Sequence, residues 1–333
     1  MTKKLNQLPK KSLGFFPTPV AELKRFSALL KGPRIFIKRD DLTGLAFGGN
    51  KTRKLEFLIG DALEQGCNSV ITAGAAQSNH CRQTAAAAAA VGLACHLALG
   101  GKQPDTLDGN LLLDELLGAK IHWTGALRKG ETIPDIVLKL TKAGNKPYVI
   151  PYGGSNEIGA AGFIEAIREL QLQLDKTETA ISHIVFASSS GGTHAGMMIG
   201  KYLFSKYDFE LSGIGIDKGE TGDTPLNQYI TDLANRTSKK LNLDVNFTIN
   251  DVILRNEFLG DGYGVVGDLE RRAIKLLAET EGILVDPVYT ARALGGVINM
   301  IEQSEFSSDD NILFWHTGGA PALFPYSSEI TGR

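Results

Sequence analysis

Short apolar runs alternate with longer amphipathic segments along almost the whole chain of 333 residues. The apolar runs have the length of buried strands and lie at 34–38, 69–72, 96–99, 120–123, 148–150, 183–187, 213–216, 283–285 and 312–315. Between them, apolar residues recur at helical spacing over 52–64, 77–90, 110–117, 158–173, 268–281 and 290–302. Strands that alternate with helices form parallel sheets with crossover helices. The sequence therefore predicts the α/β class.

The length of the chain suggests two domains, since a domain usually has about 150 residues. No Pro- or Ser-rich linker separates two halves, so we expect two domains that share chain crossings and enclose the active site between them. In open parallel sheets the functional loops lie at the carboxyl ends of the strands. We therefore expect catalytic residues directly after the strand-like runs.

The charge balance narrows the class of partner. Lys and Arg number 35 against 37 Asp and Glu, a formal net charge of -2, whereas a nucleic-acid-binding surface is basic. The three cysteines, Cys67, Cys81 and Cys95, lack the spacing of a zinc site, so we expect no metal. The N-terminal lysines precede no apolar signal region, and the apolar run at 85–95 is too short to span a bilayer. We expect a cytoplasmic protein that acts on a small molecule, without nucleic acid or membrane.

The first motif, GGNKTRKLE, places Lys51 after Gly48, Gly49 and Asn50 at the start of a predicted helix. The positive potential of a helix N-terminus favours the neutral form of an amine. A neutral amine can form a Schiff base with a carbonyl cofactor. A solvated loop lysine is the alternative for a lone residue of this kind.

The second motif, SSSGGTHAG, directly follows the strand-like run at 183–187 and contains Ser190, Gly191, Gly192 and Thr193. Backbone N–H groups at a helix N-terminus bind phosphate when no side chain obstructs them. The motif differs from the dinucleotide-binding and P-loop patterns. A tight turn at a packed strand–helix junction is the alternative.

The third motif, AGAAQSNHCRQTA, places Gln77, Ser78, Asn79 and His80 at the start of another predicted helix. Hydroxyl, amide and backbone N–H groups in this position suit a carboxylate, and Ser78 could also transfer a proton. A simple N-cap by Ser or Asn is the alternative.

Three further segments have the character of active-site loops. GDGYG contains Tyr263, DPVYT contains Tyr289 and Thr290, and HTGG contains Thr317 after the last strand-like run. A lone tyrosine usually packs in the core or at its rim. Two tyrosines in loops marked by Gly or Pro, together with a Thr-Gly-Gly segment, indicate a site.

The order of these motifs, from GGNK through SNH, SSSGGTHAG and DPVYT to HTGG, resembles the pyridoxal-phosphate enzymes of the tryptophan-synthase-β fold type, fold type II. Within it the chain is most similar to the branch that holds 1-aminocyclopropane-1-carboxylate deaminase and D-cysteine desulfhydrase. The resemblance extends from FPTPV at 16–20 to the last Gly-Gly pair. It implies open, mostly parallel sheets with helices on both faces, a large cofactor-binding domain of residues 1–50 and 163–333, and a small domain of residues 51–162. It also implies pyridoxal 5'-phosphate as cofactor and a homodimer.

The resemblance further implies roles at the matching positions. Lys51 would hold the cofactor covalently, and Asn79 would hydrogen-bond the ring 3-oxygen. Ser78 would bind the substrate carboxylate or transfer a proton. The cofactor phosphate would lie against Ser190, Gly191, Gly192 and Thr193. The substrate, a small amino acid, would contact Gln77, Ser78, Asn79 and His80, and the reacting face would be lined by Tyr263 and Tyr289.

Two positions depart from the deaminases of the family, which carry Glu after the second tyrosine and Leu before the last Gly-Gly pair. This sequence has Thr290 and Thr317 there, as in the desulfhydrase-like members, and both would contact the cofactor. A carboxylate beside the pyridine nitrogen keeps it protonated and makes the ring a strong electron sink. A threonine hydroxyl does so far less, and β-elimination needs this sink less than opening of a cyclopropane does. The sequence therefore favours β-elimination from D-cysteine to pyruvate, ammonia and hydrogen sulfide.

Several alternatives stay open. L-Cysteate sulfo-lyase and 1-aminocyclopropane-1-carboxylate deaminase could share every motif quoted above. A nicotinamide-dependent oxidoreductase is an alternative from another class, because Asp217 ends the apolar run that follows Gly191, roughly where a ribose-binding acid would lie. The missing G-x-G-x-x-G pattern argues against it. A non-catalytic amino-acid-binding protein would have no need of Lys51.

Overall fold

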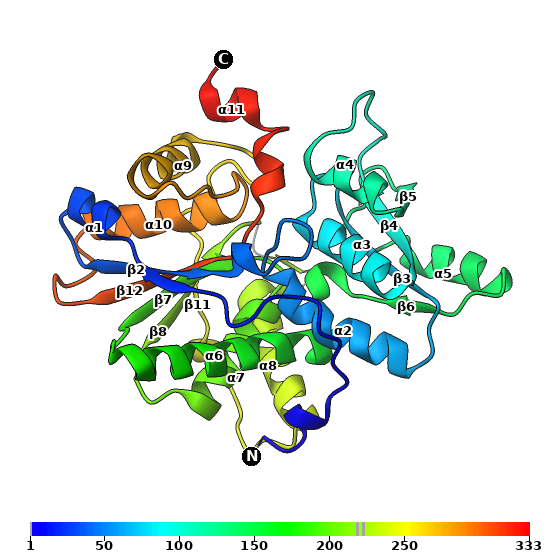
Figure 1. Cartoon of the computed structure of the whole chain (residues 1–333), viewed down its shortest axis with the longest axis horizontal. Coiled ribbons are helices and arrows are strands. Elements are labelled where there is room, and N and C mark those ends of the chain that lie inside the picture. The colour runs from blue at the N-terminus through cyan, green and yellow to red at the C-terminus, as the bar shows by residue number, and fades with distance from the viewer. Residues whose placement is uncertain (1, 218–219, 222–223) are drawn as a thin grey trace.

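A six-stranded sheet forms the centre of the larger part of the molecule (Figure 1). The computed structural model describes residues 2–217, 220–221 and 224–333. From edge to edge the strands are β1 (Val20–Glu22), β2 (Arg34–Arg39), β12 (Asn311–His316), β7 (His183–Ser188), β8 (Glu210–Gly215) and β11 (Ile253–Arg255). All neighbours are parallel except β1 and β2. The last strand of the chain thus lies in the middle of the sheet, between β2 and β7.

Helices cover both faces of this sheet (Figure 1). On one face lie α1 (Lys24–Leu30), α9 (Asp268–Glu281) and α10 (Thr290–Glu302). On the other face lie α6 (Glu157–Thr177), α7 (Gly192–Phe204) and α8 (Leu226–Lys240). Successive side chains of a strand point to opposite faces. In β12, Ile312 and Phe314 accordingly pack against the face covered by α1, α9 and α10. Leu313 and Trp315 pack against the face covered by α6, α7 and α8.

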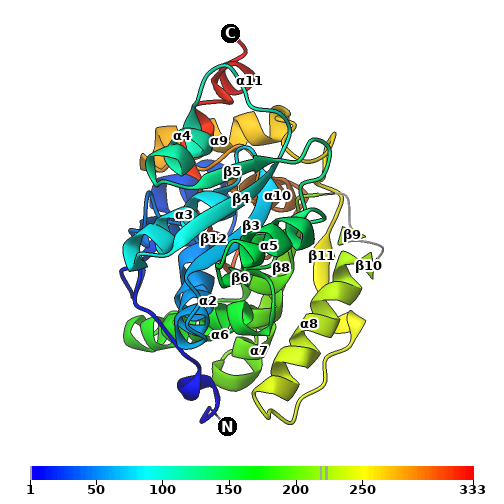
Figure 2. The ribbon, with the colours of Figure 1, turned by 90° about the vertical axis from the view of Figure 1, so that its right-hand side faces the viewer.

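A second sheet of four parallel strands lies beside the first (Figure 2). Its order is β5 (Lys120–Trp123), β4 (Ala94–Gly100), β3 (Ser69–Ala75) and β6 (Pro147–Val149). Its helices are α3 (Asn79–Val91), α4 (Gly109–Leu116) and α5 (Ile133–Lys142). Ile71 and Ala98 face α5 and form a small core with Ile133 and Ile136.

Helix α2 (Lys51–Glu64) connects the two parts, because it packs against both α6 and α3 (Figure 1). All four strands of the smaller sheet fall within 51–162, the range expected for the small domain. The expected boundary at 162/163 lies inside α6, which is one continuous helix. Helices α6 and α2 pack closely there: a Cβ added to Gly162 would lie 2.3 Å from the Arg53 carbonyl oxygen. The division into domains stays a prediction.

One predicted strand is wrong. The segment 283–285 pairs with no strand among the described residues, although Val285 is buried. The carbonyl oxygen of Leu284 accepts a hydrogen bond from His316 Nε2 at 2.9 Å, so a side chain takes the place of a neighbouring strand. Its apolar residues therefore reflect burial rather than pairing.

The sequence predictions do not include several elements of the structure. They are the strands β1, β9 (Glu220–Thr221), β10 (Thr224–Pro225) and β11, and the helices α1, α5, α8 and α11 (Ser327–Thr331). Short 3-10 turns lie at Leu5–Gln7, Asp40–Leu42, Tyr152–Gly154, Ile249–Asp251 and Ala320–Leu323. The helix predicted from residue 77 begins at Asn79, because Ser78 is its N-cap. The other predicted helices are present, with ends shifted by a few residues at most.

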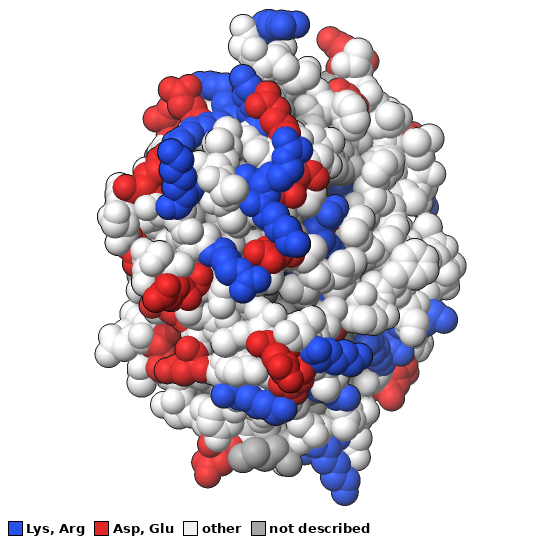
Figure 3. All heavy atoms as spheres, turned by 60° about the vertical axis from the view of Figure 1, so that its left-hand side comes forward, with Lys and Arg blue, Asp and Glu red and all other residues white. Residues whose placement is uncertain are grey.

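The surface shows no large field of a single sign on the face drawn in Figure 3, where acidic and basic side chains are interspersed. The N- and C-termini lie at opposite ends of the molecule (Figures 1 and 2). No helix in the described part of the chain combines the length and the apolar character needed to cross a membrane.

Candidate active site

A pocket lies between the two sheets, where strand ends and helix N-termini meet. It brings together nine residues that the sequence singles out: Lys51, Ser78, Asn79, His80, Ser190, Gly191, Thr193, Tyr289 and Thr317. They come from the starts of α2, α3 and α7 and from the loops around β7, α10 and β12. Four other predicted residues do not line it: Gln77, Gly192, Tyr263 and Thr290. The carboxyl ends of parallel strands thus hold the site, as expected for open α/β sheets.

Lys51 is the first residue of α2, and its side chain lines the pocket. Burial lowers the pKa of its amine to about 8, because the charged form loses solvation. Among the described residues, none hydrogen-bonds or forms an ion pair with this amine. A substantial fraction of neutral amine is therefore present near neutral pH, as a nucleophile toward a carbonyl carbon requires.

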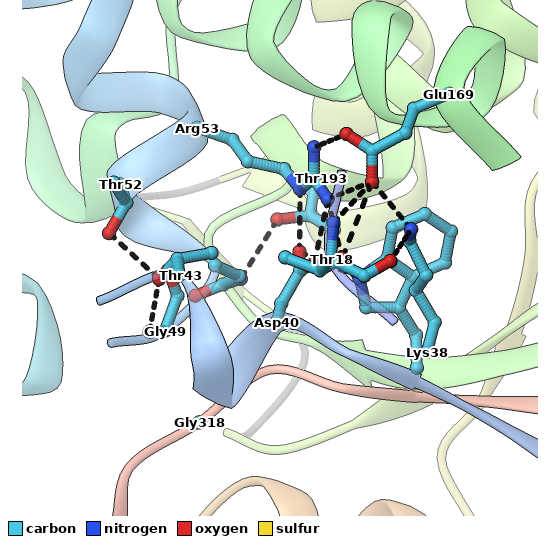
Figure 4. A network of polar contacts seen from close by, with 12 residues as sticks. Thr18, Lys38, Asp40, Thr43, Gly49, Thr52, Arg53, Glu169, Thr193 and Gly318 are labelled. Carbon is cyan, nitrogen blue, oxygen red and sulfur yellow. Dashed lines mark hydrogen bonds and ion pairs between the residues drawn. The ribbon is translucent and has the colours of Figure 1, made fainter. Parts of the chain in front are cut away.

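Hydrogen bonds fix the loop that carries Lys51 (Figure 4). Thr43 Oγ1 accepts from the Gly49 N–H at 2.8 Å and hydrogen-bonds Thr52 Oγ1 at 3.1 Å. Asn50 Nδ2 donates to Thr193 Oγ1 at 3.3 Å, which ties the start of α2 to the start of α7. Gly48 has a φ of +64°, and a Cβ there would lie 2.0 Å from the Asp41 carbonyl oxygen. The glycine pair thus allows the tight turn that aims Lys51 into the pocket.

The SSSGGTHAG segment forms a cradle of backbone N–H groups and hydroxyls at the N-terminus of α7. Gly191, with a φ of +80°, is the N-cap of the helix. The Gly192 N–H donates to Ser155 Oγ at 3.1 Å, and Ser155 Oγ lies 2.8 Å from Ser190 Oγ. Free backbone N–H groups and hydroxyls at a helix N-terminus suit a phosphate group.

Lys54 and Ser155 complete this cradle and were missed in the sequence. Lys54 Nζ donates to the Gly153 carbonyl oxygen at 3.1 Å and to Ser155 Oγ at 3.3 Å. Burial, with the charge of Lys51, lowers the pKa of Lys54 well below its usual value. Its position three residues after Lys51 in a helix places both amines on one side, which is the signal that could have found it. A buried amine without an anionic partner fits a site for an anion.

The SNH segment begins α3, and its Ser78 both caps the helix and lines the pocket. Ser78 is the N-cap of the helix, and its Oγ accepts from the Cys81 N–H at 3.2 Å, yet the residue also lines the pocket. His80 Nε2 lies 2.9 Å from Thr72 Oγ1. Burial, helped by the charges of Lys51 and Lys54, lowers the pKa of His80 well below its usual value, so its ring stays neutral.

Gln77 has a different position from the one expected. Its Oε1 accepts from the Asn110 N–H at 2.8 Å, and its Nε2 donates to the Asp108 carbonyl oxygen at 3.0 Å. Both ends of its amide thus bind the start of α4. In the structure described here Gln77 stabilises the pocket wall from outside.

The two predicted tyrosines form a pair of which only Tyr289 lines the pocket. Tyr263 and Tyr289 approach through their hydroxyl oxygens at 2.7 Å, with the rings edge to face. Burial raises the pKa of both phenols above their usual value, so both stay protonated. Arg128 stacks over the Tyr263 ring at 4.3 Å and pairs with Asp217 at 2.7 Å. Tyr289 therefore lines the pocket directly, and Tyr263 holds its hydroxyl.

Of the two threonines at the positions that depart from the deaminases, Thr290 and Thr317, only one lines the pocket. Thr317 lines the pocket, whereas Thr290 Oγ1 donates to Asp286 Oδ1 at 2.6 Å and accepts from the Asp286 N–H at 2.7 Å. The Asp286 carboxylate also accepts backbone N–H groups of Val288, Tyr289 and Thr290, so it caps α10. In the described part of the chain, no Asp or Glu lines the pocket.

Comparison with known proteins gives one family and one fold. A family model described as pyridoxal-phosphate dependent enzyme matches residues 11–318. A solved structure titled as that of an ACC deaminase homologue is 34% identical, with a TM-score of 0.90 over 99% of this chain and 98% of that chain. The processed form of threonine deaminase isoform 2 from Solanum lycopersicum is 16% identical, with a TM-score of 0.68 over 100% of this chain and 88% of that chain. The second likeness concerns the fold alone.

Proposed function

The chain belongs to the family of pyridoxal-phosphate-dependent enzymes, of fold type II, and from this premise we propose that it eliminates hydrogen sulfide from D-cysteine. The products are pyruvate, ammonia and hydrogen sulfide. The observation that carries this proposal is the absence of any carboxylate among the described residues that line the pocket. Thr317 lies there instead, and Thr290 lies behind it.

The residues of the pocket fit pyridoxal 5'-phosphate. The amines of the half-buried Lys51 and the buried Lys54 have no anionic partner in the described structure, and the N-terminus of α7 lies beside them. A Cβ added to Gly192 would lie 2.7 Å from Ser155 Oγ and 3.0 Å from Lys54 Nζ, so the cradle needs glycine to stay open. We assign the covalent bond to Lys51 and the phosphate to the cradle, with Asn79 at the 3-oxygen and Thr317 at the ring nitrogen.

When bound, the cofactor supplies an aldehyde carbon for the substrate amine and a ring that withdraws electrons from the α-carbon. Lys51, in the neutral form of its amine, would be the base that takes the proton of the substrate α-carbon. Ser78 is the alternative group for this proton transfer; its Oγ accepts the N-cap bond, so its own hydroxyl proton is not used there. Tyr289 lines the pocket, and because its phenol stays protonated it can hydrogen-bond the substrate but cannot act as a base.

The leaving group decides between elimination and ring opening. Thiolate accepts the electron pair of the broken C–S bond, so elimination from cysteine requires little electron storage by the ring. Opening of a cyclopropane without an α-hydrogen requires more, and a carboxylate beside the ring nitrogen would supply it. Thr317 offers only a hydroxyl. The pocket therefore favours elimination.

1-Aminocyclopropane-1-carboxylate deaminase activity is the second candidate, because the solved structure that is 34% identical is titled as a homologue of that enzyme. L-Cysteate sulfo-lyase activity is a third, since sulfite and sulfide leave from the same carbon. The threonine positions distinguish the deaminase from the present proposal. Only a substrate panel distinguishes the sulfo-lyase from it.

The test compares four substrates: D-cysteine, L-cysteine, L-cysteate and 1-aminocyclopropane-1-carboxylate. We expect pyruvate from D-cysteine to form much faster than 2-oxobutanoate from the cyclopropane acid, and a barrier difference of about 4 kcal/mol would mean roughly a thousandfold in rate. The double variant Thr290→Glu with Thr317→Leu should narrow this gap, whereas Thr317→Ser, which keeps the hydroxyl, should not. If the unaltered enzyme prefers the cyclopropane acid, the deaminase proposal replaces this one.

We also propose that the enzyme acts in the cytoplasm as a homodimer on small amino acids, without nucleic acid or membrane partners. The net charge of -2 and the family resemblance support this. Sedimentation of the cofactor-loaded protein should give twice the 35.8 kDa chain mass.

A further inference from the structure

We propose that Asn110, at the start of α4 and outside the pocket lining, is a positioning residue that fixes which end of the Asn79 amide faces the cofactor. The inference rests on the role proposed above for Asn79. It concerns a contact between two side chains that lie far apart in the sequence, on α3 and α4.

Every polar group of the Asn110 side chain is used. Its Nδ2 donates to Asn79 Oδ1 at 2.9 Å and to the Gln77 carbonyl oxygen at 3.0 Å. Its Oδ1 accepts from Arg82 Nη1 at 2.8 Å. The residue is fully buried, with 0% of its surface exposed. No water is needed to satisfy this amide, so its geometry is set by protein groups alone.

Arg82 sets the direction of the whole chain of bonds. A guanidinium only donates hydrogen bonds, so the Asn110 group that faces it must be the oxygen. The Asn110 nitrogen therefore faces Asn79, and Asn79 must present its own oxygen in return. Burial lowers the pKa of Arg82 to about 10, which leaves it charged at neutral pH. Because the amide oxygen and nitrogen look alike in shape, this donor is what distinguishes the two orientations.

Arg82 is itself anchored on the loop that carries Lys51. Its Nη2 donates to the Gly48 carbonyl oxygen at 2.6 Å, and Gly48 lies three residues before Lys51. The chain of bonds therefore joins the lysine loop to Asn79 through Arg82 and Asn110. The buried Arg82 side chain thus connects the loop of Lys51 to the segment of Asn79, and both segments would contact the cofactor.

The consequence is a free donor at the pocket. Asn79 Nδ2 donates to no other residue in the described part of the chain, and Asn79 lines the pocket. A donor beside the 3-oxygen of the cofactor favours the deprotonated oxygen and the yellow form of the bound cofactor. An amide oxygen in that place would favour a proton on the 3-oxygen and the colourless form. Asn110 should therefore control this balance without touching the cofactor.

The variant Asn110→Asp tests this with almost no change of shape. A carboxylate still accepts from Arg82, but it cannot donate to Asn79 Oδ1, so the Asn79 amide should turn its nitrogen toward residue 110. We expect the ratio of yellow to colourless bound cofactor at one pH to fall roughly tenfold, as for one lost hydrogen bond to a charged oxygen. Absorbance of the cofactor-loaded protein without substrate measures it.

Leu111→Met is the matched control. Leu111 follows Asn110 in α4, has only 1% of its surface exposed, and has no polar side-chain atom that could bond Asn79 or Arg82. This exchange should leave the absorbance ratio unchanged. An equal change in both variants would mean that any disturbance of α4 alters the cofactor, and it would overturn the proposal.

A second pair of variants keeps the test decisive if Asn110→Asp does not fold. Arg82→Lys retains a group that only donates and should keep the yellow form. Arg82→Gln brings a group that can donate or accept, so it should lose part of that form. If either series binds the cofactor at Lys51 and shows the unaltered ratio throughout, the positioning role is wrong while the proposed function stands. If no cofactor is attached to Lys51 in the unaltered protein, the proposed function itself fails.

Discussion

Helix α2 places basic side chains in two regions that differ in whether carboxylates lie beside them. On one side Arg53 enters an ion cluster that consists of Lys38, Asp40, Arg53 and Glu169 (Figure 4). On the other side Lys51 and Lys54 enter the pocket. The two regions lie within four residues of the helix, so their difference arises from the partners rather than from depth alone.

In the ion cluster every charge has an opposite charge in contact. Arg53 Nε lies 2.8 Å from Asp40 Oδ2, its Nη2 lies 2.9 Å from Glu169 Oε1, and Lys38 Nζ lies 2.5 Å from the same Glu169 oxygen. Burial alone would lower the pKa of Arg53, but Asp40 and Glu169 outweigh it and raise the pKa above its usual value. Burial would likewise raise the pKa of Asp40, and Arg53 outweighs it, so that pKa is lowered.

In the pocket the burial effect is not balanced. Burial lowers the pKa of Lys51 to about 8 and that of Lys54 well below its usual value, and no carboxylate among the described pocket residues opposes it. Two carboxylates thus outweigh burial at Arg53, whereas at Lys38 burial outweighs Glu169 and Asp40 and lowers the pKa. At Lys51 and Lys54 no carboxylate opposes burial, which leaves room for a ligand that brings negative charge and a carbonyl carbon.

The largest expected effect is on Lys51. Lys51→Arg keeps the positive charge but removes the neutral amine, so activity should fall on the order of 10⁴-fold, a barrier change of about 5.5 kcal/mol. Lys54→Arg, three residues along the same helix, keeps its charge and should lose far less. Borohydride reduction followed by mass spectrometry should place the cofactor on Lys51 in the unaltered protein. An adduct on another lysine would contradict the assignment.

The next effect is on stability, and it tests the two regions against each other. Asp40→Asn leaves Arg53 and Lys38 with Glu169 as their only anion in the cluster and should lower the free energy of unfolding by about 3–5 kcal/mol. Lys54→Met removes a buried amine that has no anion, so the cofactor-free protein should keep or gain stability. Urea unfolding of the two cofactor-free variants measures this. Equal destabilisation by both would show that the contrast between the regions is not energetic.

A smaller effect is on cofactor affinity. Lys54→Met should weaken binding of the cofactor by roughly ten- to a hundredfold, as expected for one lost charge-assisted hydrogen bond. Gly192→Val should act in the same direction by filling the cradle, since its Cβ would lie 3.0 Å from Lys54 Nζ. Titration of the cofactor into each cofactor-free variant gives the dissociation constant. Unchanged affinity in both would mean that the phosphate binds elsewhere.

The sequence predicts the pocket better than it predicts the ion cluster. Lys51, Asn79 and Thr193 follow strand-like runs or begin helices, and such local patterns indicate strand ends and helix starts. The ion cluster has no local pattern, because it joins Lys38 and Arg53 to Glu169, more than a hundred residues away. Its charged residues are typical of solvated faces when they are considered singly.

The same distinction explains what the sequence missed or misplaced in the site. Ser155 and Asn110 reach it through contacts between segments that are distant along the chain. The roles of Thr290 and Thr317 look equivalent in the sequence, and only the position of Asp286 separates them. In the fold, strong apolar periodicity gave the helices, whereas 283–285 shows that an apolar run does not specify a pairing partner.

The smallest expected effect is a pH dependence, and its sign follows from the amine of Lys51. Only the neutral amine attacks the cofactor aldehyde, and a pKa of about 8 makes it roughly one-tenth neutral at pH 7 and nine-tenths neutral at pH 9. The rate of cofactor attachment to the cofactor-free protein should therefore rise about tenfold over this range and then level off. The amine of an exposed lysine, with a pKa near 10.4, would still be gaining reactivity there. Stopped-flow absorbance, with Lys51→Arg as the background, measures the midpoint. A midpoint near 10 would show that Lys51 is solvated like a surface lysine, and the contrast between the pocket and the ion cluster would lose its physical basis.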